Sequence, residues 1–196
     1  MDARLLELCN EVFLETHGEH LLDTVAARLV RAAASFHATP ARFQADVRNW
    51  EFESNAGMED TIALSTLSNL RDVLEVYTYD ENGVASTASE TTFSGLINPS
   101  SETECGGYCV WVRAGDILRV KSSKAFSFIS LVSTHPPIPT LDNFDTWLYP
   151  NYKHWLVQLG IAITQNAVGD DSSGLSLKLA EDAKRQLIAS IPKYKG

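Results

Sequence analysis

The stretch Phe128-Ile129-Ser130-Leu131-Val132, followed by Pro136-Pro137-Ile138-Pro139, decides the fold of this 196-residue chain. The apolar run predicts a strand within Ser127–Ser133, and the prolines predict its end because proline has no N–H to donate to a sheet. A polar link, Leu141-Asp142-Asn143-Phe144-Asp145, then leads into two helical patterns that fill most of the remaining chain. These residues contain no nucleophile motif, metal-ligand cluster or phosphate loop, so they indicate a scaffold.

Four segments carry the apolar spacing of amphipathic helices. Gly18, Pro40, Gly169 and Pro192 mark their ends, and Pro150 suits the first turn of the third helix. In the first helix we expect the apolar stripe to consist of Leu5, Leu8, Cys9, Val12 and Phe13. In the last helix we expect it to consist of Leu175, Leu179, Ala183, Leu187 and Ile191. The predicted helices cover about residues 3–17, 22–39, 150–168 and 173–191.

Between the two helix pairs the pattern becomes extended. Short extended segments are expected from about Arg42, and a strand over Asp72–Asp80 ends at the Asn82-Gly83 turn. Residues 110–113 and 117–120 predict a hairpin around Gly115, and Ser127–Ser133 is expected to be a separate last strand. Residues 84–108 are rich in Ser, Thr, Glu and Gly, which predicts a long exposed loop with weak strands.

The order helix, helix, strands, helix, helix predicts an α+β fold, because grouped strands do not make alternating βαβ units. We expect the N-terminal and C-terminal helix pairs to form one helical bundle, with the strands as a central antiparallel β lobe. The predicted parts are residues 1–40 for the N-terminal helices, 41–140 for the β lobe, and 141–196 for the C-terminal helices and a short tail.

Charge is distributed unevenly along the chain, whose formal net charge is −9. Residues 1–100 hold 16 of the 25 acidic and 6 of the 16 basic residues, whereas residues 101–196 are nearly neutral. Such a chain lacks the clustered basic residues that bind phosphates. An acidic surface could still surround DNA that moves past it without binding. The simpler alternative, in which the acidic residues only keep the protein soluble, stays open.

The sequence also bears on the compartment. No apolar run approaches the ~20 residues that a membrane helix needs. The acidic, amphipathic start Met1-Asp2-Ala3-Arg4-Leu5 is unlike a signal peptide, so we expect synthesis in a cytoplasm. Three cysteines, an odd number, argue against a disulfide framework. Cys105 and Cys109 flank two glycines and are a candidate disulfide, with free thiols as the alternative.

Catalytic motifs are absent from the sequence, which contains no G-x-S-x-G, P-loop or G-x-G-x-x-G pattern. Asp142 and Asp145 could act as paired carboxylates, but we expect them to stabilise the start of a helix. His154 is expected on a polar edge. His17 with His20, and the acidic run over residues 51–60, lack the spacing of zinc and calcium sites. We therefore predict no enzyme activity, no metal and no cofactor.

Several segments together resemble the head-to-tail adaptor (connector) proteins of tailed bacteriophages, particularly those of short-tailed phages. The resemblance covers most of the chain as a pattern rather than a sharp motif. The loop with Cys105 and Cys109 and the short tail depart from it. The residues that carry it are the acidic helix Leu5–Val12, the small residues of the second helix, the Trp50 segment, Thr61–Ser65 before Leu70–Tyr77, Ile129–Pro137, Phe144–Pro150, and Trp155-Leu156-Val157 before a terminal helix.

The resemblance implies a late structural protein of the virion, located at the head–tail junction after synthesis in the host cytoplasm. Twelve copies would form a ring between the portal and the tail, extend the DNA channel used in genome ejection, and provide a platform for tail attachment. Its partners would be further copies of itself, the portal protein, a tail or nozzle protein, and double-stranded DNA that passes through without specific binding.

Residue roles follow from that implied ring. Its subunit interface is expected to use Ala26 and Ala33 of the second helix, and Trp155 and Leu159 of the third. Contact with the portal is expected from the tail, because a short basic end with an aromatic anchor can become ordered on docking. A frayed terminus is the alternative. The tail residues concerned are Pro192, Lys193, Tyr194 and Lys195.

Two other functions stay open. One is a tail terminator or another ring protein of the tail tube or neck. Sixfold tail tubes are usually dominated by β-structure, whereas about half of this chain has a helical pattern, which favours the adaptor. The other is a small hydrolase or a virion-borne lytic factor, which would need clustered acids or a nucleophile–base pair.

Overall fold

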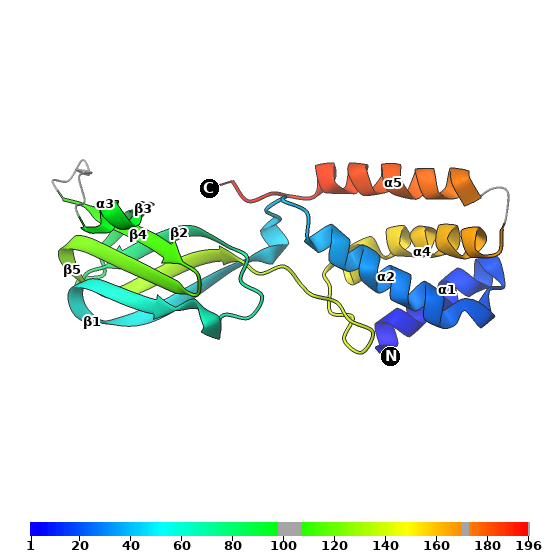
Figure 1. Ribbon diagram of the computed structural model, residues 1–196, viewed down its shortest axis with the longest axis horizontal. Helices are drawn as coiled ribbons and strands as arrows, with labels where there is room; N and C mark the ends of the chain where they lie inside the picture. The colour runs from blue at the N-terminus through cyan, green and yellow to red at the C-terminus, as the bar shows by residue number, and fades with distance from the viewer. Residues whose placement is uncertain (98–106, 170–172, 196) are drawn as a thin grey trace. The chain divides into compact units, whose positions relative to one another are not determined.

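The computed structural model describes residues 1–97, 107–169 and 173–195 and divides them between two compact units (Figure 1). The helical unit comprises Met1–Ala45 and Pro136–Lys193, and the β unit comprises Asp46–His135 with the residues from Tyr194 onward. The predicted α+β class is confirmed. Along the chain, the boundaries between the units follow residues 45 and 135, whereas we expected them at residues 40 and 140. Tyr194 belongs to the β unit and not, as expected, to the helical part.

Four long helices build the helical unit. Helix α4 packs against each of the other three, and α1 and α5 lie along different sides of it (Figure 1). In the described ranges no helix is both long enough and apolar enough to cross a membrane. The helices are α1 (Ala3–Thr16), α2 (Leu22–His37), α4 (Leu148–Ala167) and α5 (Ser173–Ser190), with a 3₁₀ turn, η1 (Glu19–Leu21), before α2.

Helix α1 shows how the sequence fixes an element. Asp2 caps it, because the Asp2 carboxylate accepts a hydrogen bond from Arg4 N at 2.8 Å. The helix ends at His17, which is left-handed with φ 52° and donates its N–H to Phe13 O. The expected stop, Gly18, lies one residue later. The predicted apolar stripe is the buried one: Leu5, Leu8, Cys9, Val12 and Phe13.

An aromatic cluster forms the centre of the helical core. Phe36 stacks on Phe43 with ring centroids 5.3 Å apart and lies 5.5 Å from Trp155. Trp155 also donates its Nε1–H to Ala180 O at 3.3 Å, so it joins α4 to α5. Close helix packing needs Gly160 of α4, since a Cβ at this position would collide with Val12 of α1.

This core corrects the expected subunit interface. Ala26 and Ala33 are completely buried, Trp155 is 3% exposed, and Leu159 packs against the same core. Ala26, Ala33 and Trp155 contact their own chain and present almost no surface to another copy, whereas Leu159 is partly buried. Helical spacing predicts that a stripe is buried, but it does not distinguish burial within one chain from burial between two.

The β unit is a sheet in the order β1-β5-β2-β3-β4, closed by a further pairing of β4 with β5. β5 is the central strand. Its first half pairs with β4, its second half pairs with β2, and both halves pair with β1. The strands are β1 (Val47–Ala63), β2 (Asp72–Tyr79), β3 (Ala85–Glu90), β4 (Cys109–Ala114) and β5 (Ile117–Thr134), with short helices η2 (Gln44–Asp46), η3 (Leu64–Thr66) and α3 (Phe93–Ile97).

Strand lengths differ from those expected. The predicted hairpin around Gly115 is confirmed, but Ser127–Ser133 is part of β5 and not a separate strand. Residues 121–124 are polar and lie between the two predicted strands, yet Lys121 pairs with both β1 and β4, Ser122 pairs with β4, and backbone hydrogen bonds do not require apolar side chains. β3 lies in the predicted loop and pairs with β4 in parallel, which departs from a purely antiparallel lobe.

Candidate functional site

The acidic candidates for catalysis are engaged in ion pairs. Asp142 lies 3.2 Å from the Met1 amino group, and Asp145 lies 3.1 Å from Arg4 Nη1. Neither caps α4, whose N-cap residue is Trp147; the Oγ1 of the preceding Thr146 accepts from Leu148 N at 3.2 Å. His154 is exposed on α4, as expected. Across the described ranges, no three His, Cys, Asp or Glu residues are grouped so that they could hold a metal ion.

His135 directly follows β5 and is buried. Its Nδ1 lies 2.7 Å from Ser68 O, and a carbonyl only accepts, so Nδ1 carries the proton. Nε2 then accepts from Trp50 Nε1 at 3.0 Å and from Ser133 Oγ at 2.8 Å. Both ring nitrogens therefore form hydrogen bonds within the β unit.

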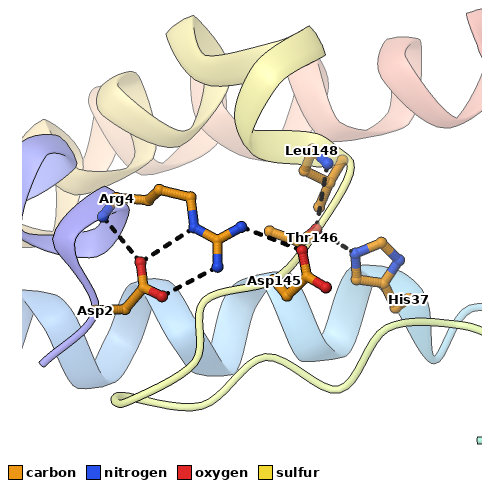
Figure 2. A network of polar contacts seen from close by, with 6 residues as sticks. All are labelled: Asp2, Arg4, His37, Asp145, Thr146 and Leu148. Carbon is orange, nitrogen blue, oxygen red and sulfur yellow. Dashed lines mark hydrogen bonds and ion pairs between the residues drawn. The ribbon is translucent and has the colours of Figure 1, made fainter.

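Figure 2 shows a set of polar contacts that joins the start of α1 to the link before α4. We call it the polar clamp; its members are Asp2, Arg4, His37, Asp145 and Thr146. The Arg4 guanidinium donates to Asp2 Oδ2 at 3.0 Å and to Asp145 Oδ1 at 3.1 Å. On the other side of the link, His37 Nε2 lies 2.6 Å from Thr146 Oγ1. The hydrogen bond from the Arg4 side chain holds the pKa of Asp2 far below its usual range. The clamp has a structural role, because its charges are paired with one another.

Replacing Asp2 with alanine should lower the free energy of unfolding by about 1 kcal/mol at pH 7, as expected for the loss of an N-cap. Because the folded pKa of Asp2 is depressed, this stabilisation is complete above the unfolded carboxyl pKa of ~3.9 and is lost as the pH falls below it. The difference in unfolding free energy between the wild type and the Asp2→Ala chain, measured in urea, should therefore narrow as the pH falls from about 4 towards 2. Asp145→Ala is the control and should cost less than about 0.5 kcal/mol, since the Asp145 side chain is 79% exposed.

The tail is fixed in place rather than frayed. Pro192 O accepts from Gln44 N at 3.0 Å, and Lys193 forms a β-bridge with Phe43. Tyr194 is half-buried and donates its hydroxyl to Glu75. Burial, followed by this hydrogen bond, raises the pKa of Tyr194 to about 12. Among the four predicted portal-binding residues, the exposed ones are Pro192, Lys193 and Lys195.

The two predicted disulfide partners differ in what the structure describes. Cys109 is buried in β4, with Sγ 3.4 Å from Thr78 Oγ1, and burial raises the pKa of its thiol. Cys105 lies outside the described residues. Their pairing therefore stays a prediction.

Two exposed apolar faces distinguish the surface of the helical unit. On α1, Leu6 is 41% exposed and Leu14 is 77% exposed. On α5, Leu175 is 64% exposed and Leu179 is 60% exposed, although both were expected in the buried stripe. We call these the α1 face (Leu6, Asn10, Leu14 and Glu15) and the α5 face (Leu175, Lys178 and Leu179).

A groove between α4 and α5 adjoins the α5 face. It has a volume of ≈ 520 Å³, and Leu179 of the α5 face forms part of its wall. Ile161 of α4 and Ala183 of α5 provide further apolar surface. The polar lining residues are Gln158, Ser176, Gln186 and Asp182, whose carboxylate lies 3.7 Å from Arg185 Nη1. The groove could accept an apolar side chain from a partner.

The β unit carries a smaller and more acidic pocket of ≈ 340 Å³. Glu51, Asp80 and Glu81 line it together with Tyr79 and Phe128. These carboxylates make it a poor place for phosphate.

The comparisons give no family for this chain. No protein-family model matches the sequence, and no curated protein matches it. Function must therefore be inferred from the surfaces themselves. Sequence patterns could have indicated the α1 face, because Leu6 and Leu14 fall outside the buried stripe of their helix. Sequence patterns could not have indicated the α5 face, because its leucines belong to the same apolar stripe as the residues that α4 covers.

Proposed function

We propose that this chain is a head-to-tail adaptor of a tailed bacteriophage, of the short-tailed type. Twelve copies would form a ring between the portal and the tail, extend the DNA channel and provide the platform for tail attachment. The observation that carries the proposal is the presence of two unlike apolar faces, on α1 and on α5. A ring of identical copies needs two different surfaces on each copy, one for each neighbour.

Electrostatics also supports a channel for moving DNA. The pocket of the β unit presents three carboxylates, those of Glu51, Asp80 and Glu81. DNA must pass an adaptor without being held, and acidic surfaces repel phosphate. A DNA-binding protein would instead show clustered basic residues with aromatic side chains between them.

The alternatives have less support. A tail terminator or tail-tube ring protein would be dominated by strands, whereas half of this fold is a bundle of helices that contain 14 to 20 residues each. For a hydrolase, the candidate residues would have to converge. Instead, Asp145 is held by Arg4 and His154 is exposed on α4.

The tail keeps its proposed role in portal binding, through its exposed lysines. Lys193 is held in the helical unit by its β-bridge to Phe43, and Lys195 follows Tyr194, which donates its hydroxyl to Glu75 in the β unit. Removing the whole tail would also remove its contacts with Phe43 and Gln44. Point substitutions of the lysines are therefore a cleaner test than truncation.

The test is a mixture of the chain with the purified portal ring of the same phage. Electron micrographs should show a twelvefold collar added beneath the portal. The double variant Lys193→Glu/Lys195→Glu should bind the portal at least about tenfold more weakly, because charge reversal replaces attraction with repulsion across the contact. Lys124→Glu, an exposed lysine of β5, is the matched control and should bind normally. Portal rings that stay bare in excess protein would refute the adaptor function.

A further inference from the structure

We infer that the α1 face of one copy binds the α5 face of the next. The inference rests on the proposed function and deepens it, because it assigns the surfaces that would join neighbouring subunits. The occupant of each face is then a second copy of this chain.

Exposure supplies the first reason. Leu14, Leu175 and Leu179 each leave more than half of their side chain in water, at 77%, 64% and 60%. Leu175 and Leu179 are four residues apart, so they lie on one side of α5. Leu6 and Leu14 lie about two turns apart on the same half of α1. Long apolar side chains gathered on two helices indicate surfaces that a partner covers.

Charge determines which partner fits each face. Glu15 follows Leu14 directly and is exposed; Lys178 precedes Leu179 directly and is exposed. Within the part of the chain that the structure describes, neither has an opposite charge at ion-pair distance, whereas Glu7 and Glu11 are both held by Lys153. Pairing α1 with α5 brings Glu15 and Lys178 together. Pairing α1 with α1, or α5 with α5, would bring like charges together.

Shape agrees with this pairing. Leu179 forms a wall of the groove between α4 and α5, where Ile161 and Ala183 are also accessible. A leucine from the α1 face of another copy, such as Leu14, can enter that groove and meet Leu179.

The placement of the faces makes the contact repeat. Helices α1 and α5 lie along different sides of α4, so one copy presents both faces at separate places (Figure 1). A contact from α1 to α5 leaves one face unused on each of the two copies. Further copies therefore add until a ring closes.

Two leucine variants test the contact by sedimentation velocity. Leu14→Asp and Leu179→Asp should each remove the concentration-dependent association of the wild type and leave a folded monomer. A 1:1 mixture should give a heterodimer and nothing larger, because Leu14→Asp keeps a working α5 face and Leu179→Asp keeps a working α1 face. Val84→Asp, 61% exposed in the β unit, is the control and should associate like the wild type.

Charge reversal supplies a second, gentler test. Glu15→Lys and Lys178→Glu should each weaken self-association by about tenfold. Mixing these two variants should restore it, because every contact in an alternating ring then joins opposite charges. The inference is overturned by homodimers of either leucine variant, by unchanged assembly of those variants, or by a wild type that stays monomeric at its highest soluble concentration.

The failure of this inference differs from failure of the adaptor function. A collar that forms on the portal equally well with Leu14→Asp or Leu179→Asp would refute the assigned contact alone. A chain that associates through these faces but never binds the portal would refute the adaptor function alone.

Discussion

Replacing Trp155 with alanine should lower the free energy of unfolding of the isolated monomer by about 3–5 kcal/mol. The indole is 3% exposed, lies 5.5 Å from the Phe36 ring and donates to Ala180 O, so the substitution removes both packing and a hydrogen bond. Because a domain of this kind is stable by only about 5–15 kcal/mol, much of the stability of the helical unit would be lost. Urea unfolding followed by circular dichroism, at a dilution where the chain is monomeric, measures the change.

The matched control is Leu179→Ala on the neighbouring helix. Leu179 is 60% exposed, and its truncation should change monomer stability by less than about 0.5 kcal/mol. Together the two variants separate a core residue from an interface residue. If Trp155→Ala left the monomer as stable as the wild type and impaired only assembly, Trp155 would belong to the subunit interface as the sequence suggested.

His135→Ala should destabilise the β unit by about 2–3 kcal/mol. The substitution leaves the buried Ser133 hydroxyl, the Trp50 N–H and the Ser68 carbonyl without their partner, and each buried group left unpaired costs ~1–3 kcal/mol. The total is below the sum, because Trp50 is only half-buried and Ser68 is exposed, so water can reach both. Equilibrium unfolding in urea again measures the effect.

Two further variants make the His135 test specific. His154→Ala, at an exposed position of α4, should have little effect. In the double variant His135→Ala/Trp50→Phe, the Trp50 N–H is no longer left unpaired, so the double variant should lose less stability than the sum of the two single changes. Strictly additive losses would show that the hydrogen bond between Trp50 and His135 contributes nothing.

Periodicity predicted the helices well, because each buries one stripe against its own unit. The stripe Leu5, Leu8, Cys9, Val12 and Phe13 was read correctly, as was the hairpin around Gly115. Strand ends were predicted less well. The polar segment of residues 121–124 continues β5, because Lys121 pairs with β1 and β4 and Ser122 pairs with β4, which no local pattern reveals.

Surfaces were harder to predict than elements. Ala26, Ala33 and Trp155 were expected between subunits and are buried in the core of one chain. Leu175 and Leu179 were expected in the core and are exposed. An apolar stripe gives the same sequence signal in both cases, and only the position of α4 determines which residues it covers.

The sequence by itself determined the α+β class, the four helices, the acidic character of the N-terminal half and the absence of catalytic motifs, since these follow from local spacing and composition. Tertiary structure alone decided that β5 is one strand shared by three partners, that Tyr194 is attached to Glu75, and which leucines of α5 stay in water. Each of these depends on contacts between residues far apart in the chain. Such contacts are set by how the elements pack, which no window of neighbouring residues contains.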